Sequence, residues 1–149
     1  MVLVALYLAR LRAPDVVPGP TETPAPSTPP PGHPESTSPN AVTPVTDAFR
    51  SRRSNVEVLT AGRVVRLLPD DRQGSPHERI LVRVEGGPTV LVAHNLDLAP
   101  RVPVAVGDSI ELKGEYEWNS KGGVVHWTHR DPQGRHETGW IRYQGRLYQ

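Results

Sequence analysis

The chain has 149 residues, of which 36% are hydrophobic and 22% charged, and its formal net charge is +1. Eleven of its 17 prolines fall between Pro14 and Pro44, so the folded part is about the last hundred residues. These features exclude a multidomain enzyme, a helical bundle and a multi-span membrane protein. The chain has no cysteine, which excludes disulfides, thiolate metal sites, a cysteine nucleophile and a lipidated cysteine.

Residues 1–12 begin with the apolar run MVLVALYLA, which is followed by Arg10 and Arg12. Nine residues are too few to cross a bilayer, which needs about 20. We interpret this segment as the remainder of a truncated signal or membrane anchor, with a short helix-forming leader as the alternative. We therefore expect an exported or membrane-associated protein of the periplasm or cell envelope, tethered through its N-terminus. The two arginines argue the other way, because basic residues tend to hold their side in the cytoplasm.

Residues 13–49 are rich in proline, serine and threonine. Such a composition buries too little apolar surface to offset the entropy of ordering, and its prolines favour extended conformations. The segment is predicted to be a disordered spacer, and a proline-rich ligand for an SH3-type domain is the alternative.

From about residue 50 the pattern changes to short β-strands. Alternating or apolar runs predict strands at 56–68, 80–85, 90–92, 110–118, 124–129, 139–143 and 146–148. The clearest is 110–118, in which Ile110, Leu112, Tyr116 and Trp118 share one face. The opposite face carries Glu111, Lys113, Glu115 and Glu117, which we interpret as a solvated exterior without a catalytic role. The glycine-bearing segment 119–123 connects this strand to 124–129 as a hairpin.

Short strands with glycine turns and almost no helix predict an all-β domain at residues 50–149. The expected architecture is a small OB-like barrel of five or six strands, and a small β-sandwich is the runner-up. Gly62 and Gly114 interrupt strands where a barrel could bend sharply. The segment VGDSIEL is a turn leading into a strand, as is common before the fourth strand of OB-type barrels.

Four blocks of this domain are similar to a bacterial family described as domain of unknown function 3465. They are LPDDRQGSPHERILVRV, LVAHNLDLAPR, VGDSIELKGEYEWNSKGGVVHWTH and DPQGRHETGWI, and together they span about residues 60–149. The resemblance implies a barrel fold and an envelope setting. It implies no activity and no catalytic residues, so the function has to be inferred from side-chain chemistry.

Five histidines fall between His77 and His136, and several of them lie where strands meet loops. Neutral imidazole is the commonest protein ligand of metals, and three ligands leave an open position for water. This pattern suggests a site for a divalent metal such as zinc, with His77, His94, His126 and His129 as ligands. On one strand His126 and His129 would face opposite sides, so a bulge or a strand end before His129 is needed for them to converge.

The competing interpretation is that the histidines are structural. His129 with Asp131, and His94 with Asp97, are natural partners in turns. A metal-free acid/base pair is a further alternative, because histidine titrates near neutral pH. No known hydrolase signature is present.

The aromatic residues suggest another use of the domain. Trp118, Trp127 and Trp140 could form a stacking platform beside arginines for single-stranded nucleic acid or a glycan. The alternative is core packing, which the sequence favours for Trp118 because it shares a face with Ile110 and Leu112. At least one of Trp127 and Trp140 is expected to be exposed.

We therefore expect a binding module for an anionic ligand, either single-stranded nucleic acid or a glycan, that acts as a monomer. A metal-dependent hydrolase of the phosphodiesterase or nuclease type is the alternative enzyme hypothesis, and a partner-docking module is a third. The predicted ligand-binding residues are His77, His94, Asn95, Asp97, Arg101, Trp127, His129, Arg130, Asp131, His136 and Trp140.

Overall fold

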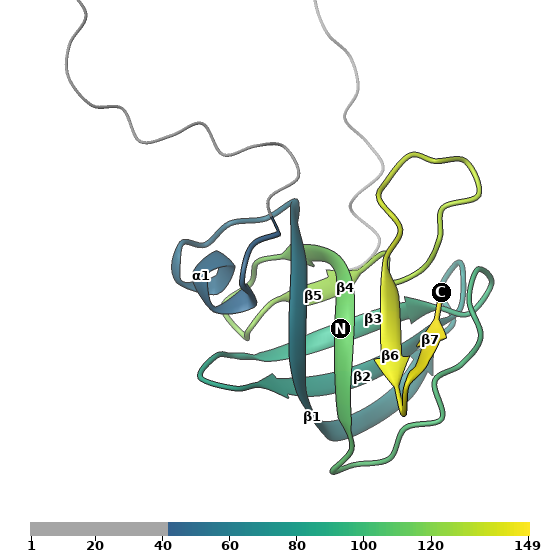
Figure 1. Ribbon diagram of the computed structural model, residues 1–149, viewed down its shortest axis with the longest axis horizontal. Helices are drawn as coiled ribbons and strands as arrows, with labels where there is room; N and C mark the ends of the chain where they lie inside the picture. Colours follow the sequence, from purple (N-terminus) through teal and green to yellow (C-terminus); the bar gives the residue numbers. More distant parts are fainter. Residues whose placement is uncertain (1–41) are drawn as a thin grey trace, which may run out of the picture. The chain divides into compact units, whose positions relative to one another are not determined.

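A computed structural model describes residues 42–149 of the chain (Figure 1). The predictions for residues 1–12, and for the linker as far as residue 41, lie outside the described residues. The described part holds one short helix, α1 (Val45–Arg50). Its strands are β1 (Val56–Asp71), β2 (His77–Val84), β3 (Thr89–Asn95), β4 (Ser109–Glu117), β5 (Val124–His126), β6 (Trp140–Tyr143) and β7 (Arg146–Tyr148). No helix within residues 42–149 has the length and apolarity that a membrane crossing requires.

All seven strands belong to one sheet, and five of them close into a ring. β1 pairs with β2 and β4, β2 pairs with β3, and β5 lies between β3 and β4, with β3 and β5 parallel. β6 and β7 extend the sheet as a hairpin beyond β4 (Figure 1). The all-β prediction is confirmed, and the ring has the five strands of an OB-like fold.

The length of β1 allows it to pair on both sides of the ring. Its first half pairs with β4 and its second half with β2, and Gly62 takes part in both pairings. A Cβ at Gly62 would lie 2.6 Å from the carbonyl oxygen of Arg83, so only glycine permits this close approach. The strand predicted at 56–68 continues to Asp71, and Pro69 lies where the register with β2 shifts between Leu68 and Asp71.

Alternating residues of the ring strands fill the interior. Ile80, Val82 and Val84 of β2 all point inward, as the sequence pattern predicts. Tyr116 of β4 is fully buried, and its hydroxyl donates a hydrogen bond to the carbonyl of Gly122. Each large apolar side chain buried in this way contributes about 1.5–3 kcal/mol to folding.

Helix α1 lies in the segment for which the sequence predicts a disordered spacer. Val45 and Ala48, which are three residues apart on one helix face, are buried in the core. Trp118 donates from its indole nitrogen to the carbonyl of Phe49, which ties the helix to the end of β4. A six-residue helix leaves too short an apolar period to be recognised from sequence.

Candidate functional site

The long loop between β5 and β6 begins where β5 ends at His126 (Figure 1). Trp127 has a φ of 55°, a left-handed conformation that breaks the strand. A strand end at this position is the condition under which His126 and His129 were expected to converge. Both residues line one cavity of about 360 Å³. We call it the histidine pocket, and its lining residues are His77, Ala93, Asn95, Leu98, His126, Trp127, His129, Arg135 and His136.

The imidazoles of His77, His129 and His136 are fixed in the same way. Each ring places Nδ1 at 2.7–2.8 Å from a backbone carbonyl oxygen, that of Ser75, Arg130 and Glu137 respectively. A carbonyl oxygen can only accept, so Nδ1 carries the proton in each neutral ring. Nε2 is then an unprotonated acceptor that can receive a hydrogen bond or bind a metal.

Burial keeps two of the pocket histidines neutral. Desolvation is the main cause that lowers the pKa of His126 to about 4, and neighbouring imidazoles lower it further. Burial also lowers the pKa of His129, against the opposing effect of its hydrogen bond to the carbonyl of Arg130. At neutral pH these two rings are therefore uncharged, and an unprotonated ring nitrogen can accept a hydrogen bond or bind a metal.

Trp127 supplies an aromatic surface at the pocket. Its ring is stacked on His136 with centroids 4.6 Å apart and planes 14° apart, and it contacts His126 at a steeper angle. Trp127 is nevertheless 39% exposed, as expected for one of the two tryptophans. The indole is thus held in a fixed orientation while part of it remains exposed.

A turn beginning at Asp131 holds Arg135, the only arginine of residues 42–149 that lines the histidine pocket. The Asp131 carboxylate accepts hydrogen bonds from the backbone of Gln133 and of Arg135, and from Nε of Arg135 at 3.1 Å. These bonds hold the pKa of Asp131 well below its usual range. Asp131 therefore orders its own turn and does not bond the ring of His129, while the side chain of Arg135 remains 71% exposed.

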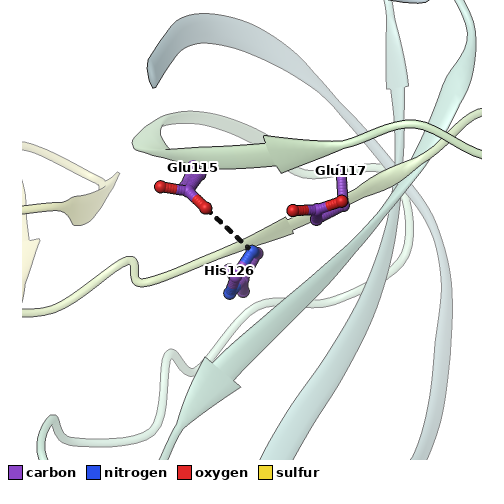
Figure 2. A group of neighbouring side chains, drawn as sticks. All are labelled: Glu115, Glu117 and His126. Atoms are coloured by element: carbon purple, nitrogen blue, oxygen red, sulfur yellow. Dashed lines mark ion pairs between the residues drawn. The ribbon is translucent and has the colours of Figure 1, made fainter. Parts of the chain in front are cut away.

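Two carboxylates and His126 form a second group beside the pocket. Ligand atoms of Glu115, Glu117 and His126 all lie within 4.8 Å of one another (Figure 2). His126 Nε2 is buried without a hydrogen-bond partner, and its nearest acidic atom is Glu115 Oε1 at 3.8 Å. Burial first, and then the negative charge of Glu117, raise the pKa of Glu115. We call these three residues the Glu–His group.

The Glu–His group and the histidine pocket share one neighbourhood. Glu115 lines a smaller cavity of about 260 Å³, and Trp127, Arg135 and His136 line both this cavity and the histidine pocket. A ligand in either cavity would therefore contact the same tryptophan, arginine and histidine.

The structure places His94 away from the lining of the histidine pocket. Its ring is fully buried, its Nε2 donates to the carbonyl of Pro100, and its Nδ1 accepts from the hydroxyl of Thr128. Desolvation lowers the pKa of His94 to about 4. The predicted pairing of His94 with Asp97 is not formed, because Thr128 and Pro100 occupy both ring nitrogens of His94. The four predicted metal ligands are thus not brought together as a set.

Arg101 and Trp140 also lie outside the pocket lining. Arg101 pairs with Asp70 and with the buried Glu78, whose pKa is raised by its burial. Trp140 on β6 is covered by the guanidinium of Arg142 at 4.7 Å. Both residues have structural contacts that account for their positions.

Glu115 and Glu117 were not predicted as site residues because their alternation along the strand indicated an ordinary solvated face. The predicted hairpin could have identified them, because its register decides which side chains lie opposite one another. Its short connection sets a register in which Glu115 pairs with His126 and Glu117 with Val124. Side chains directly opposite each other on one sheet face are neighbours, so His126 belongs beside Glu115.

A family profile described as "Protein of unknown function (DUF3465)" matches residues 35–149. The match covers most of the chain, which therefore belongs to this family, as the four sequence blocks indicate. No curated protein and no solved structure matches the chain significantly.

Proposed function

We propose that this member of the DUF3465 family binds single-stranded nucleic acid through the histidine pocket. The observation that carries the proposal is that Trp127, which is 39% exposed, and Arg135, whose side chain is 71% exposed, line the same pocket. An aromatic ring stacks on any base, and an arginine recognises a phosphate with its planar fork. A cavity of about 360 Å³ lies within the usual size range of ligand pockets.

The free imidazole nitrogens fit the polar edges of a nucleotide. Nε2 of His77, His129 and His136 is an acceptor in the neutral ring, so it can receive a hydrogen bond from an N–H group of a base, such as N3–H of thymine, or from a sugar hydroxyl. Asn95 uses its side-chain oxygen within its own turn, which leaves its amide hydrogens as donors. The histidines would thus recognise the base or sugar, and Arg135 the phosphate.

This proposal is tested by measuring the binding of a short labelled oligothymidine to the full chain by fluorescence anisotropy. The measurement is made in low salt, and a chelator is present. Trp127→Ala should weaken binding by about tenfold or more, since stacking of one base is worth about 1–3 kcal/mol. Arg135→Gln should weaken binding several-fold and reduce its dependence on salt. Arg146→Gln, an exposed arginine that lies over Tyr148 on β7, is the matched control.

Two results would contradict the proposal. One is the absence of binding to the wild-type protein, and the other is an equal loss of binding in the Arg146→Gln control. Binding of a neutral oligosaccharide that is insensitive to both salt and Arg135→Gln would instead identify a glycan as the ligand.

Metal-dependent phosphodiester hydrolysis is the second candidate function, and the Glu–His group favours it. Three protein ligands leave positions on a metal ion at which water and a phosphate oxygen can bind. Cleavage of the oligonucleotide in the presence of a divalent metal, abolished by a chelator and by Glu117→Gln, is the expected result for this function. Intact oligonucleotide under all conditions would reject it.

A further inference from the structure

We infer that Glu115, Glu117 and His126 form a binding site for one divalent metal ion of the zinc or manganese class. The site lies on the outer face of β4 and β5, where the sequence indicated only a solvated surface. The inference does not depend on nucleic-acid binding, because it follows from the charges and geometry of the group itself.

The charge balance along β4 separates this group from its neighbours. Glu111 pairs with Arg142 at 2.8 Å, and Lys113 pairs with Glu57 at 2.6 Å. By contrast, no lysine or arginine within residues 42–149 forms an ion pair with Glu115 or Glu117. The two carboxylates project from the same strand face, partly buried, with their negative charges unbalanced. A bound cation would supply the missing positive charge.

His126 gives the group its third ligand. Its Nε2 is buried and has no hydrogen-bond partner, which is costly for a polar atom unless something else binds it. In Figure 2 the ring lies on the neighbouring strand and faces the two carboxylates. A metal ion would satisfy this nitrogen and both carboxylates at once.

The geometry is close to what a metal requires. Since the three ligand atoms lie within 4.8 Å of one another, a single point lies within about 2.8 Å of all of them. Zinc is bound by nitrogen and carboxylate oxygen at about 2.0–2.2 Å, so small side-chain rotations would complete the contacts. The strand positions are fixed by backbone pairing, in which Glu115 lies opposite His126.

Isothermal titration of the tag-free full chain with Zn²⁺, repeated with Mn²⁺, tests the site. We expect saturable binding of one ion of at least one of these metals, weakened at least about tenfold in Glu117→Gln and in His126→Gln. Glu111→Gln is the matched control, since Glu111 is a glutamate on the same face of β4 outside the group, and it should bind like wild type. Because His126→Gln changes a partly buried residue, thermal unfolding of each variant establishes that it is folded.

Other outcomes would overturn the inference. One is that neither metal binds at millimolar concentration. Another is that Glu117→Gln leaves metal binding unchanged. Binding lost in His129→Gln but retained in Glu117→Gln would place the ion in the histidine pocket, which also overturns it. Oligonucleotide binding is measured with a chelator present, so failure of the metal site and failure of the proposed function are separate results.

Discussion

Substitution of the buried His94 by glutamine should reverse the stability order of wild type and variant between pH 7 and pH 4. The folded protein holds the pKa of His94 at about 4, against 6.5 for an unperturbed ring. A depressed histidine pKa stabilises the fold fully above pH 6.5, and this contribution is lost as pH falls towards 4 because the unfolded state takes up the proton first. The loss amounts to about 2 kcal/mol at pH 5 and about 3 kcal/mol at pH 4.

Glutamine can replace both hydrogen bonds of the ring, to Thr128 and Pro100, but does not titrate. At pH 7 the variant should be less stable than wild type by about 1–2 kcal/mol, as is usual for a repacked buried site. At pH 4 it should be the more stable of the two proteins by about 1–2 kcal/mol, because only wild type loses the histidine contribution.

Urea unfolding of both proteins at several pH values measures this difference directly. All other titrating groups are common to the two proteins, so their contributions cancel in the comparison. Two stability curves that stay parallel from pH 7 to pH 4 would refute the conclusion that His94 is held neutral by burial.

Three further substitutions test individual contacts. In Gly114→Ala the new Cβ would lie 2.4 Å from the carbonyl oxygen of His126, so urea unfolding should show a loss of about 1–3 kcal/mol; a change below about 0.5 kcal/mol would contradict the close approach. Asp131→Ala removes the acceptor that orders the turn before Arg135, so oligonucleotide affinity should fall several-fold with little change in the thermal midpoint. A large loss of stability would show that the turn supports the fold. Tyr116→Phe should cost about 1 kcal/mol of unfolding free energy, because a buried hydrogen bond is lost, and an unchanged urea midpoint would argue against that bond.

The all-β fold could be predicted from the sequence because strands and turns are specified by residues close together in the chain. The strict alternation from Ile110 to Trp118 and the glycine-rich connection after it identify a half-buried strand and its hairpin partner. Features that depend on contacts between residues far apart in the sequence could not be predicted. Helix α1 is stabilised by the burial of Val45 and Ala48 against the sheet, and β1 continues past Pro69 because its pairing with β2 tolerates an irregularity there.

Part of the candidate site could also be predicted from the sequence. Residue types pointed to histidines near strand ends, and three of the four predicted metal ligands do line one pocket. The sequence does not distinguish these three from His94, because the hydrogen bond that holds the buried His94 ring comes from Thr128, 34 residues away. The role of Glu115 and Glu117 required the register of the hairpin, which turns two ordinary surface carboxylates into neighbours of His126.

The proposed function depends on a ligand-binding surface formed by the partly exposed indole of Trp127 and the Nε2 atoms of the pocket histidines. Histidine and tryptophan side-chain NMR of the full chain, titrated with oligothymidine in the presence of a chelator, tests it most directly. The signals of Trp127, His129 and His136 should shift together and saturate, while those of the buried His94 stay in place. Shifts confined to residues on other parts of the sheet, or none at all, would contradict the claim.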